Sequence, residues 1–311
     1  MVKDLTEQDK KNISAAFHKA NYFWIVVSMF LGLLSHVSRA VRWKMLLKPL
    51  GYNPRLSNTF FAVMIGYLAN YALPRLGEVS RCGILNKYEK IPFTESFGTV
   101  IAERAIDLIC LTLIFCLTLF IQLNKIINLA NEKIFYPLNE KIHSLSNNHS
   151  FIIIYMAVIM ATILTLLLFF RKKIKSSVFD KFKGLLLGFW NGLKTIKSIK
   201  SPGRFVFHSV LIWCLYYFSL HVCFFSFEET RGLTIGQGLA VFIFGSIGVV
   251  FVPGGTGAYQ KLVIDTLTSP LATITFSVAF AFAWIVWTSQ LILLVGIGVI
   301  SLLLLPLVNK K

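Results

Sequence analysis

Charged residues are scarce in this sequence. Only 14% of its 311 residues are Asp, Glu, Lys or Arg, whereas ordinary soluble domains contain roughly 25%. Hydrophobic residues make up 56% of the chain, and 28 residues are phenylalanine. Such a composition excludes an ordinary soluble domain and predicts a membrane protein with several transmembrane helices.

Acidic residues are the scarcer of the two charge types: 14 Asp and Glu stand against 31 Lys and Arg, which gives a formal net charge of +17. An excess of basic residues can indicate nucleic-acid binding, but here these residues cluster between the apolar runs. That placement is typical of topology signals in a membrane protein. We therefore expect no nucleic-acid partner.

Motifs for catalysis and metal binding are also missing. The five cysteines are odd in number and include no CxxC pair, so we expect neither a disulfide framework nor a metal site. The sequence has no HExxH, no GxSxG and no dinucleotide fingerprint. A Walker A loop is excluded because Tyr259 stands where that motif needs glycine. We expect a protein that is not an enzyme and has no cofactor.

Five apolar runs are long enough to cross a membrane, which requires about 20 helical residues for a hydrocarbon layer of roughly 30 Å. The runs are residues 22–41, 96–123, 151–170, 205–227 and 271–307. The last run is long enough to be kinked or split. The sequence thus predicts an all-α, polytopic membrane protein.

Two further apolar runs are interrupted by proline. Residues 56–73 end at Pro74 and residues 233–252 end at Pro253, because proline removes a backbone donor and clashes with the preceding helical turn. Each proline is followed by a turn that contains glycine, including Gly77 in the first run. Second, short helices are predicted at residues 79–88 and 258–267. We interpret both regions as re-entrant helical hairpins.

The order of crossing helix, hairpin and crossing helix occurs twice, over residues 21–123 and again over residues 205–307. The single helix at 151–170 lies between the two units, so the second unit enters the membrane from the opposite side. The sequence therefore predicts a single membrane domain over residues 1–311, built of inverted repeats. Paired interrupted segments in such repeats indicate a transport site near the midplane.

The basic connection over residues 171–204 is predicted to be cytoplasmic, since Lys and Arg accumulate on that side of a membrane. This orientation places the N-terminus outside without a signal peptide. Either residues 1–20 cross unaided, or a preceding helix is missing from the chain. Within the connection, apolar residues at helical spacing predict an amphipathic helix over 178–200 that lies on lipid headgroups; a solvated linker helix is the alternative.

Six charged side chains fall within or beside the apolar segments of the first repeat, in NYALPRLGEVSRC and VIAERAIDLICL. They are Arg75, Glu78, Arg81, Glu103, Arg104 and Asp107. A charge in the hydrocarbon costs about 3 kcal/mol or more, so we expect the three arginines to pair with the three acids. The cluster is either only an ionic clamp or also a pocket for an anionic or zwitterionic headgroup, since arginine offers forked donors to phosphate.

Two more arginines lie on the first crossing helix. His36, Arg39 and Arg42 follow one another at intervals of three. Arg39 and Arg42 either belong to the same site or extend to the cytoplasmic surface as interface anchors. Both interpretations stay open at the level of sequence.

The second hairpin reads FVPGGTGAYQKLVIDTL and is almost uncharged at its tip. Its glycines give the backbone conformational freedom, and the helix that follows begins with amide donors that favour an anionic group. The alternative is a tight turn without a ligand. Lys261 and Asp265, four residues apart, are expected to pair.

Four segments in order, SRAVRWKMLLKPLGY, GYLANYALPRLGEVSR, GTVIAERAIDL and VPGGTGAYQ, resemble the transmembrane flippase-like region of the lysylphosphatidylglycerol synthase family. The resemblance covers residues 12–307. The family's motif residues correspond here to Arg42, Trp43, Asn70, Pro74, Arg75, Gly77, Glu78, Arg81, Glu103, Arg104, Asp107, Pro253, Gly254, Gly255 and Gly257.

The resemblance has two departures and one absence. Members often have an acidic residue where this chain has Gln260, and they usually begin with one more membrane helix ahead of residues 5–20. No counterpart of the synthase's soluble aminoacyl-transfer domain is found in this sequence. The resemblance therefore implies the membrane domain, which in fused members moves aminoacylated phosphatidylglycerol between leaflets, and not the synthase activity.

From residues and resemblance together, we predict a lipid flippase of the bacterial cytoplasmic membrane whose ligand has an anionic or aminoacylated headgroup. A non-transporting membrane partner of a separate lipid or glycan synthase is the alternative. The predicted headgroup-binding residues are Arg39, Arg42, Asn70, Arg75, Glu78, Arg81, Glu103, Arg104, Asp107, Gly254, Gly255, Gly257, Tyr259 and Gln260, and the predicted structural breaks are Pro74, Gly77 and Pro253.

Overall fold

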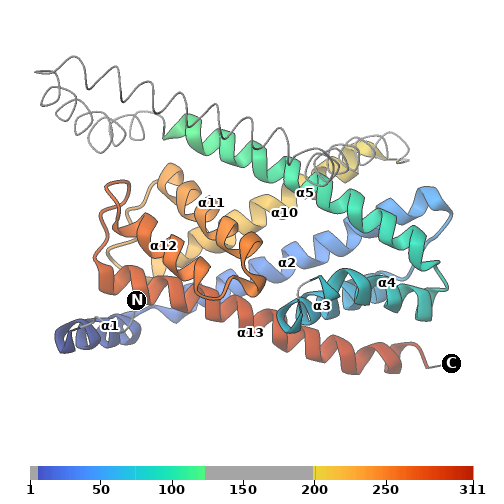
Figure 1. Cartoon of the computed structure of the whole chain (residues 1–311), viewed down its shortest axis with the longest axis horizontal. Helices are drawn as coiled ribbons and strands as arrows, with labels where there is room; N and C mark the ends of the chain where they lie inside the picture. Colours follow the sequence, from blue (N-terminus) through green and yellow to red (C-terminus); the bar gives the residue numbers. More distant parts are fainter. Residues whose placement is uncertain (1–5, 74, 123–198, 200, 311) are drawn as a thin grey trace, which may run out of the picture. The chain divides into compact units, whose positions relative to one another are not determined.

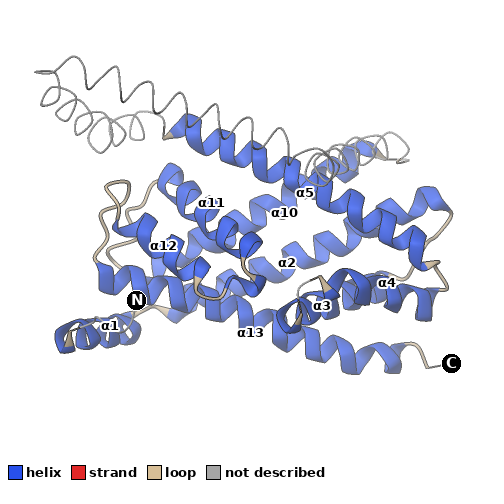
Figure 2. Cartoon of the chain, viewed as in Figure 1, coloured by secondary structure: helices blue, strands red, loops and turns tan. Residues whose placement is uncertain are grey.

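A computed structural model describes residues 6–73, 75–122, 199 and 201–310 of the chain, and all regular elements of this part are helices (Figures 1 and 2). The predicted all-α class is confirmed for these residues. The predicted helix at 151–170 lies outside them, as does the predicted amphipathic helix at 178–200 apart from Ile199.

The described helices fall into two series along the chain. The first series is α1 (Glu7–Lys19), α2 (Tyr22–Leu47), α3 (Leu56–Ala72), α4 (Leu76–Glu89) and α5 (Phe93–Ile121). The second series is α10 (Pro202–Cys223), α11 (Ile235–Phe251), α12 (Ala258–Thr268) and α13 (Phe276–Val308). Single 3₁₀ turns, η1 (Lys48–Leu50), η3 (Phe224–Ser226) and η4 (Pro253–Gly255), extend α2 and α10 and form the break between α11 and α12.

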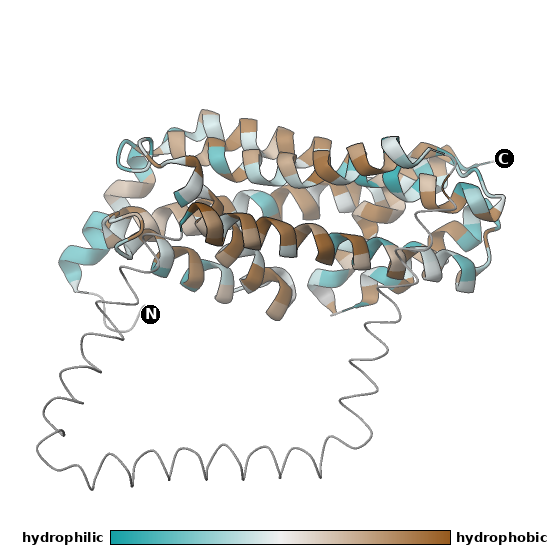
Figure 3. Cartoon of the chain, turned by 90° about the horizontal axis from the view of Figure 1, so that it is seen from above, coloured by the Kyte–Doolittle hydropathy of each residue, from teal (hydrophilic) through white to brown (hydrophobic). Residues whose placement is uncertain are grey.

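Four helices of the described part are long and apolar enough to cross a membrane. They are Tyr22–Leu50, Phe93–Ile121, Pro202–Ser226 and Phe276–Val308, each counted with any 3₁₀ turn that continues it. Apolar residues dominate the central turns of these helices (Figure 3). This confirms the prediction of a multi-pass membrane protein.

The largest differences between the predicted and the observed helices are in the first and the last crossing helix. The first crossing helix was expected to end at residue 41, but α2 continues to Leu47 because its arginines find partners inside the protein. The last crossing helix is not split: α13 runs for 33 residues, and Pro306 lies only in its last turn. The predicted run at 271–307 also starts too early, since α13 begins at Phe276.

The N-terminal segment contains a helix that was not predicted. In α1, the Thr6 hydroxyl accepts a hydrogen bond from the Asp9 amide, and the Thr6 amide donates to the Asp9 carboxylate. This is a capping box, which occupies backbone donors that a helix start otherwise leaves without partners. The Thr-x-x-Asp spacing was therefore a usable signal for the start of this helix.

Each interrupted region forms a pair of packed helices whose close approach depends on glycine. In the α3–α4 pair, a Cβ added to Gly77 would lie 2.2 Å from the Gly66 carbonyl oxygen. In the α11–α12 pair, a Cβ on Gly248 would lie 2.8 Å from the backbone of Tyr259. Both pairs thus bring backbone against backbone, which larger residues would prevent.

The two series meet along α2 and α10. The Ser28 hydroxyl contacts the Ser219 hydroxyl at 3.0 Å, and Ser38 contacts His208 Nδ1 at 2.9 Å. Since the residue number rises along α2 while it falls along α10, the two helices are antiparallel. Outside this pair, α13 packs on α3 and α11 packs on α5.

Candidate functional site

The acidic side of the candidate site is built by α5. Glu103 and Asp107 are four residues apart and so lie on one face of the helix. Glu103 is completely buried, and Asp107 is 9% exposed. A buried carboxylate requires compensation by opposite charge and hydrogen bonds.

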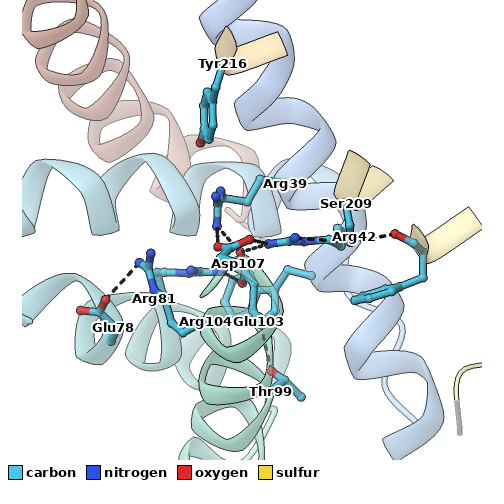
Figure 4. A network of polar contacts seen from close by, with 12 residues as sticks. Arg39, Arg42, Glu78, Arg81, Thr99, Glu103, Arg104, Asp107, Ser209 and Tyr216 are labelled. Atoms are coloured by element: carbon cyan, nitrogen blue, oxygen red, sulfur yellow. Dashed lines mark hydrogen bonds and ion pairs between the residues drawn. The ribbon is translucent and has the colours of Figure 1, made fainter. Parts of the chain in front are cut away.

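Compensation comes first from α2. Arg39 Nη1 donates to Glu103 Oε1 at 2.7 Å and to Asp107 Oδ2 at 2.6 Å, and Arg42 Nη2 donates to Asp107 Oδ1 at 2.6 Å (Figure 4). Arg42 also reaches Glu103 at 3.2 Å and Ser209 of α10 at 3.4 Å. Both arginines are buried, with exposures of 3% and 0%. The alternative that they extend to the cytoplasmic surface is therefore wrong.

A third arginine comes from α4. Arg81 Nη2 donates to Glu103 Oε2 at 2.8 Å, and its guanidinium carbon lies 4.1 Å from the centre of the Trp43 ring. The Trp43 indole in turn donates to the Thr99 hydroxyl at 2.9 Å. This cation–π contact helps to hold a third charge in a buried place. Glu103 thus joins α2, α4 and α5.

The buried cluster of Arg39, Arg42, Arg81, Glu103 and Asp107, here called the arginine cluster, has more positive than negative charge. Three guanidinium groups face two carboxylates, so one positive charge is in excess. The Nε atom of each of the three arginines is buried and has no hydrogen-bond partner among the described residues. An anionic group would compensate the excess charge, and arginine is well suited to phosphate.

Beside the cluster, a more exposed pair connects the same helices. Arg104 Nη2 of α5 donates to Glu78 Oε1 of α4 at 3.0 Å, and their side chains are 42% and 22% exposed. Arg75 is exposed and forms no ion pair within the described part of the chain. The expectation that Arg75, Arg81 and Arg104 pair completely with the acids is therefore wrong at Arg75.

The expected partners differ from those in the structure for a physical reason. Spacing within one helix indicates which side chains share a face, but packing between helices decides which charges meet. The arginines of α2 lie against α5 and occupy most of the acceptor atoms of Glu103 and Asp107. Arg75 lies at the helix break and is left without an acid.

The break before α4 has an unusual backbone. Arg75 adopts φ 68° and ψ 0°, a left-handed conformation that is unfavourable for residues other than glycine. The side chain of Asn70 accepts a hydrogen bond from the Gly77 amide at 2.8 Å and so occupies a donor at the start of α4. The structure therefore gives Asn70 a capping contact; its predicted role in headgroup binding is not tested.

At the break before α12, glycines adopt the positive φ that Arg75 adopts at the first break. Gly254, Gly255 and Gly257 have φ values of 66°, 72° and 80°, which agrees with the predicted backbone freedom. Two amides of this turn already have partners: Gly255 donates to the Val252 carbonyl, and Gly257 donates to Gln260 Oε1, both at 2.8 Å. Gln260 is 1% exposed, and its Nε2 has no hydrogen-bond partner in the part of the chain that the structure describes.

Two aromatic residues that the sequence analysis missed, Tyr71 and Trp287, contact the second break. A Cβ on Gly254 would lie 2.6 Å from the Tyr71 ring of α3, so the end of α3 lies directly against this turn. The Gly254 carbonyl accepts a hydrogen bond from the Trp287 indole of α13 at 2.8 Å. The two helix breaks therefore lie together, although nothing in the local pattern around Tyr71 or Trp287 indicates this.

Two smaller expectations concern individual groups. Lys261 Nζ lies 3.0 Å from Asp265 Oδ2, which confirms that pair. Tyr259 packs with its backbone against α11, as described above. In the described residues no group of three or more His, Cys, Asp or Glu side chains could hold a metal ion.

Comparison with known proteins identifies the family of the chain. The family described as the lysylphosphatidylglycerol synthase TM region matches residues 3–298. The chain therefore belongs to this family of membrane proteins, which confirms the predicted family.

A curated relative is a UPF0104 membrane protein of Methanocaldococcus jannaschii, which is 34% identical over 87 residues. The alignment covers 27% of this chain and 26% of the relative's own length. No solved structure matches.

Proposed function

We propose that this protein moves an anionic phospholipid or a lipid-linked intermediate between the two leaflets of a membrane. The observation that carries the proposal is the arginine cluster, a buried site with one positive charge in excess and unpartnered guanidinium donors. Buried ionisable groups in a membrane protein usually mark a substrate pathway. A phosphate-containing headgroup supplies the missing negative charge.

In this proposal, α3–α4 and α11–α12 are re-entrant hairpins. Helices α3 and α11 have 17 residues each, about 26 Å of helix, which is less than the roughly 30 Å of the hydrocarbon layer. Each is followed by a helix break and an even shorter helix. The contact between Tyr71 and Gly254 supports a common position for the two breaks within the membrane.

The two series act as inverted repeats in this scheme, with α2 equivalent to α10 and α3, α4 and α5 equivalent to α11, α12 and α13. The packing supports this. A two-fold rotation that exchanges the two series converts the contact of α3 with α13 into the contact of α11 with α5, and both contacts are present. The antiparallel packing of α2 and α10 also supports it, because inverted repeats require a two-fold axis across such a helix pair.

The headgroup is proposed to enter at the rim formed by Arg75, Glu78 and Arg104, beside the two breaks. Arg75 is the first contact, since it is exposed and has no ion pair within the described residues. Its strained backbone conformation supports a functional role, because such strain concentrates at binding sites. Headgroup type and a bacterial membrane remain predictions; the relative named above is archaeal.

Reconstituted vesicles test the proposal. Fluorescent phosphatidylglycerol and lysyl-phosphatidylglycerol are placed in one leaflet, and exchange between leaflets is measured for wild type, Arg75→Gly and Arg75→Lys. Glycine removes the guanidinium and also relieves the strain at φ 68°. We expect Arg75→Gly to lower the exchange rate about tenfold, the effect of losing one charge-assisted hydrogen bond, and Arg75→Lys to retain part of it.

Lys261→Ala is the control, because this exposed lysine contacts only Asp265 among the described residues. Glu78→Ala is a further variant. It removes the carboxylate that pairs with Arg104 at the proposed rim, so we expect it to slow exchange. Rates for wild type, Arg75→Gly and Glu78→Ala that equal one another and that of protein-free vesicles, with every lipid, would contradict transport. That result would favour the alternative, a membrane partner of a separate synthase.

A further inference from the structure

An apolar pocket, more open than enclosed and called the cavity below, lies between α5 and α11, outside the arginine cluster. Its volume is about 260 Å³, and its lining residues are Leu111, Thr112, Phe115, Ile243 and Ile247. The hydroxyl of Thr112 donates a hydrogen bond to the Leu108 carbonyl at 2.9 Å, so this residue adds no free donor to the lining. The cavity is smaller than the roughly 300–1,000 Å³ of drug-sized sites, so it suits part of a hydrocarbon chain.

The cavity continues the charged face of α5. Glu103, Asp107, Leu111 and Phe115 follow one another at intervals of four, so each adjoins the next on the helix surface, and the face they form turns by about 40° at each step. In the first half of this face the carboxylates pair with arginines, and in the second half Leu111 and Phe115 are apolar. From Asp107 to Phe115 the helix rises about 12 Å. An amphiphile with a charged head and an alkyl chain matches this order of surfaces.

The corresponding interface of the proposed other repeat is closed. There α13 packs on α3, and a Cβ on Gly298 would lie 2.8 Å from Leu68 Cβ and 3.2 Å from the Met64 carbonyl oxygen. Such contacts leave no space for a chain between these helices. The two equivalent interfaces thus differ, and the open one is beside the arginine cluster.

We propose that the cavity between α5 and α11 binds an acyl chain of the same lipid whose headgroup meets the arginines. This inference rests on the proposed function and adds to it a position for the tail. A chain in the cavity replaces contact with bulk lipid by contact with two helices, and each methylene that fits gains packing. The ligand is thereby defined as a lipid with a phosphate-containing head and a long alkyl chain.

Photo-crosslinking in vesicles tests the tail site. The probe is phosphatidylglycerol with a diazirine on one acyl chain, and labelled positions are found by mass spectrometry. In wild type we expect stronger labelling at Ile243 and Ile247 than at Ile300 and Leu303, which are exposed on α13 and report the surrounding lipid. Excess unlabelled phosphatidylglycerol is expected to remove only the cavity labelling.

Variants that fill the cavity give the decisive comparison. Thr112→Trp is expected to lower labelling of α11 about tenfold, the effect of losing contact with roughly two methylenes. Ile247→Trp fills the opposite wall and serves if Thr112→Trp does not fold. Leu117→Trp is the matched control, since Leu117 lies on α5, is 49% exposed and does not line the cavity.

Equal labelling of α11 in Thr112→Trp, Ile247→Trp and Leu117→Trp would overturn the tail site. So would wild-type labelling of α11 no stronger than that at Ile300 and Leu303. Leaflet exchange measured in the same vesicles keeps the two proposals separate. If Thr112→Trp abolished the labelling but the wild-type protein showed no exchange, the tail site would be supported and transport would be contradicted.

Discussion

At the scale of single residues, Glu103 has more ion-pair partners than any other charged residue of the described protein. It accepts hydrogen bonds from Arg39 and Arg42 of α2 and from Arg81 of α4. Its burial is complete, so its negative charge is stabilised by these arginines and not by water. The same carboxylate also reduces the mutual repulsion of three neighbouring guanidinium groups. The cluster therefore fastens helices and, through its excess charge, is suited to an anion.

Glu103→Gln tests the fastening role. Glutamine keeps the size and shape of glutamate but removes the charge, which leaves three buried arginines with Asp107 alone. Breaking a buried ion pair costs about 3–5 kcal/mol, so we expect a large fall in the free energy of unfolding. Thermal unfolding in detergent, followed by tryptophan fluorescence, measures it.

Asp265→Asn is the matched control for this charge removal. Asp265 pairs with Lys261 on the surface of α12, where both side chains are more than half exposed. Surface pairs of this kind contribute less than about 1 kcal/mol. If Glu103→Gln lowered stability no more than Asp265→Asn does, the cluster would not fasten the helices.

At the scale of elements, glycine decides how closely the paired helices approach. Gly77 faces the Gly66 carbonyl, and Gly248 faces the backbone of Tyr259. Neither pair has space for a Cβ between its helices. The first pair also places Asn70 against the Gly77 amide, so packing and capping depend on the same approach.

Gly77→Ala is expected to separate α3 from α4. The new Cβ would lie 2.2 Å from a backbone oxygen, which cannot rotate away, and overpacking of this kind costs about 1–3 kcal/mol. Gly83→Ala is the control on the same helix: nothing lies within 4 Å of its added Cβ, so it should be neutral or raise stability by up to about 1 kcal/mol. Equal melting temperatures for the two variants would show that the close approach is not required.

Much of this architecture could be predicted from sequence, because the signals are local. Pro74 and Pro253 marked both helix breaks, and α12 was predicted within one residue of its observed end. The partners of Arg39 and Arg42 could not be predicted, since they depend on the packing of α2 against α5. The contact of Tyr71 with Gly254 joins residues far apart in sequence and has no local signal either.

At the scale of the whole described protein, contacts between the two series organise the membrane domain. Besides the serine pair of α2 and α10, Gln290 of α13 donates to both Ser28 and Ser219 at 3.3 Å. Near the other end of α13, the side chains of Asn309 and Asn58 of α3 exchange hydrogen bonds at 2.8 and 2.9 Å. Polar contacts thus fix the register of helices whose remaining surfaces are largely apolar, as is common between membrane helices.

The orientation of α10 gives a last prediction. This helix has 22 residues, about 33 Å, so its two ends should lie on opposite sides of the membrane. Gly203 lies at its start, next to the basic connection predicted to be cytoplasmic, and Gly232 lies after its end. A Cβ at either position meets nothing within 4 Å, so cysteine can be introduced at both without a clash.

In a variant whose five natural cysteines are replaced by alanine, a membrane-impermeant thiol reagent should label Gly232→Cys in intact cells. Gly203→Cys should react only after the cells are permeabilised, because positive charge is retained on the cytoplasmic side. The cysteine-free variant measures background labelling. Reaction of both positions in intact cells would mean that α10 does not cross the membrane, and the inverted repeats would fail with it. Labelling of Gly203→Cys alone would keep the repeats and reverse the orientation of the whole domain.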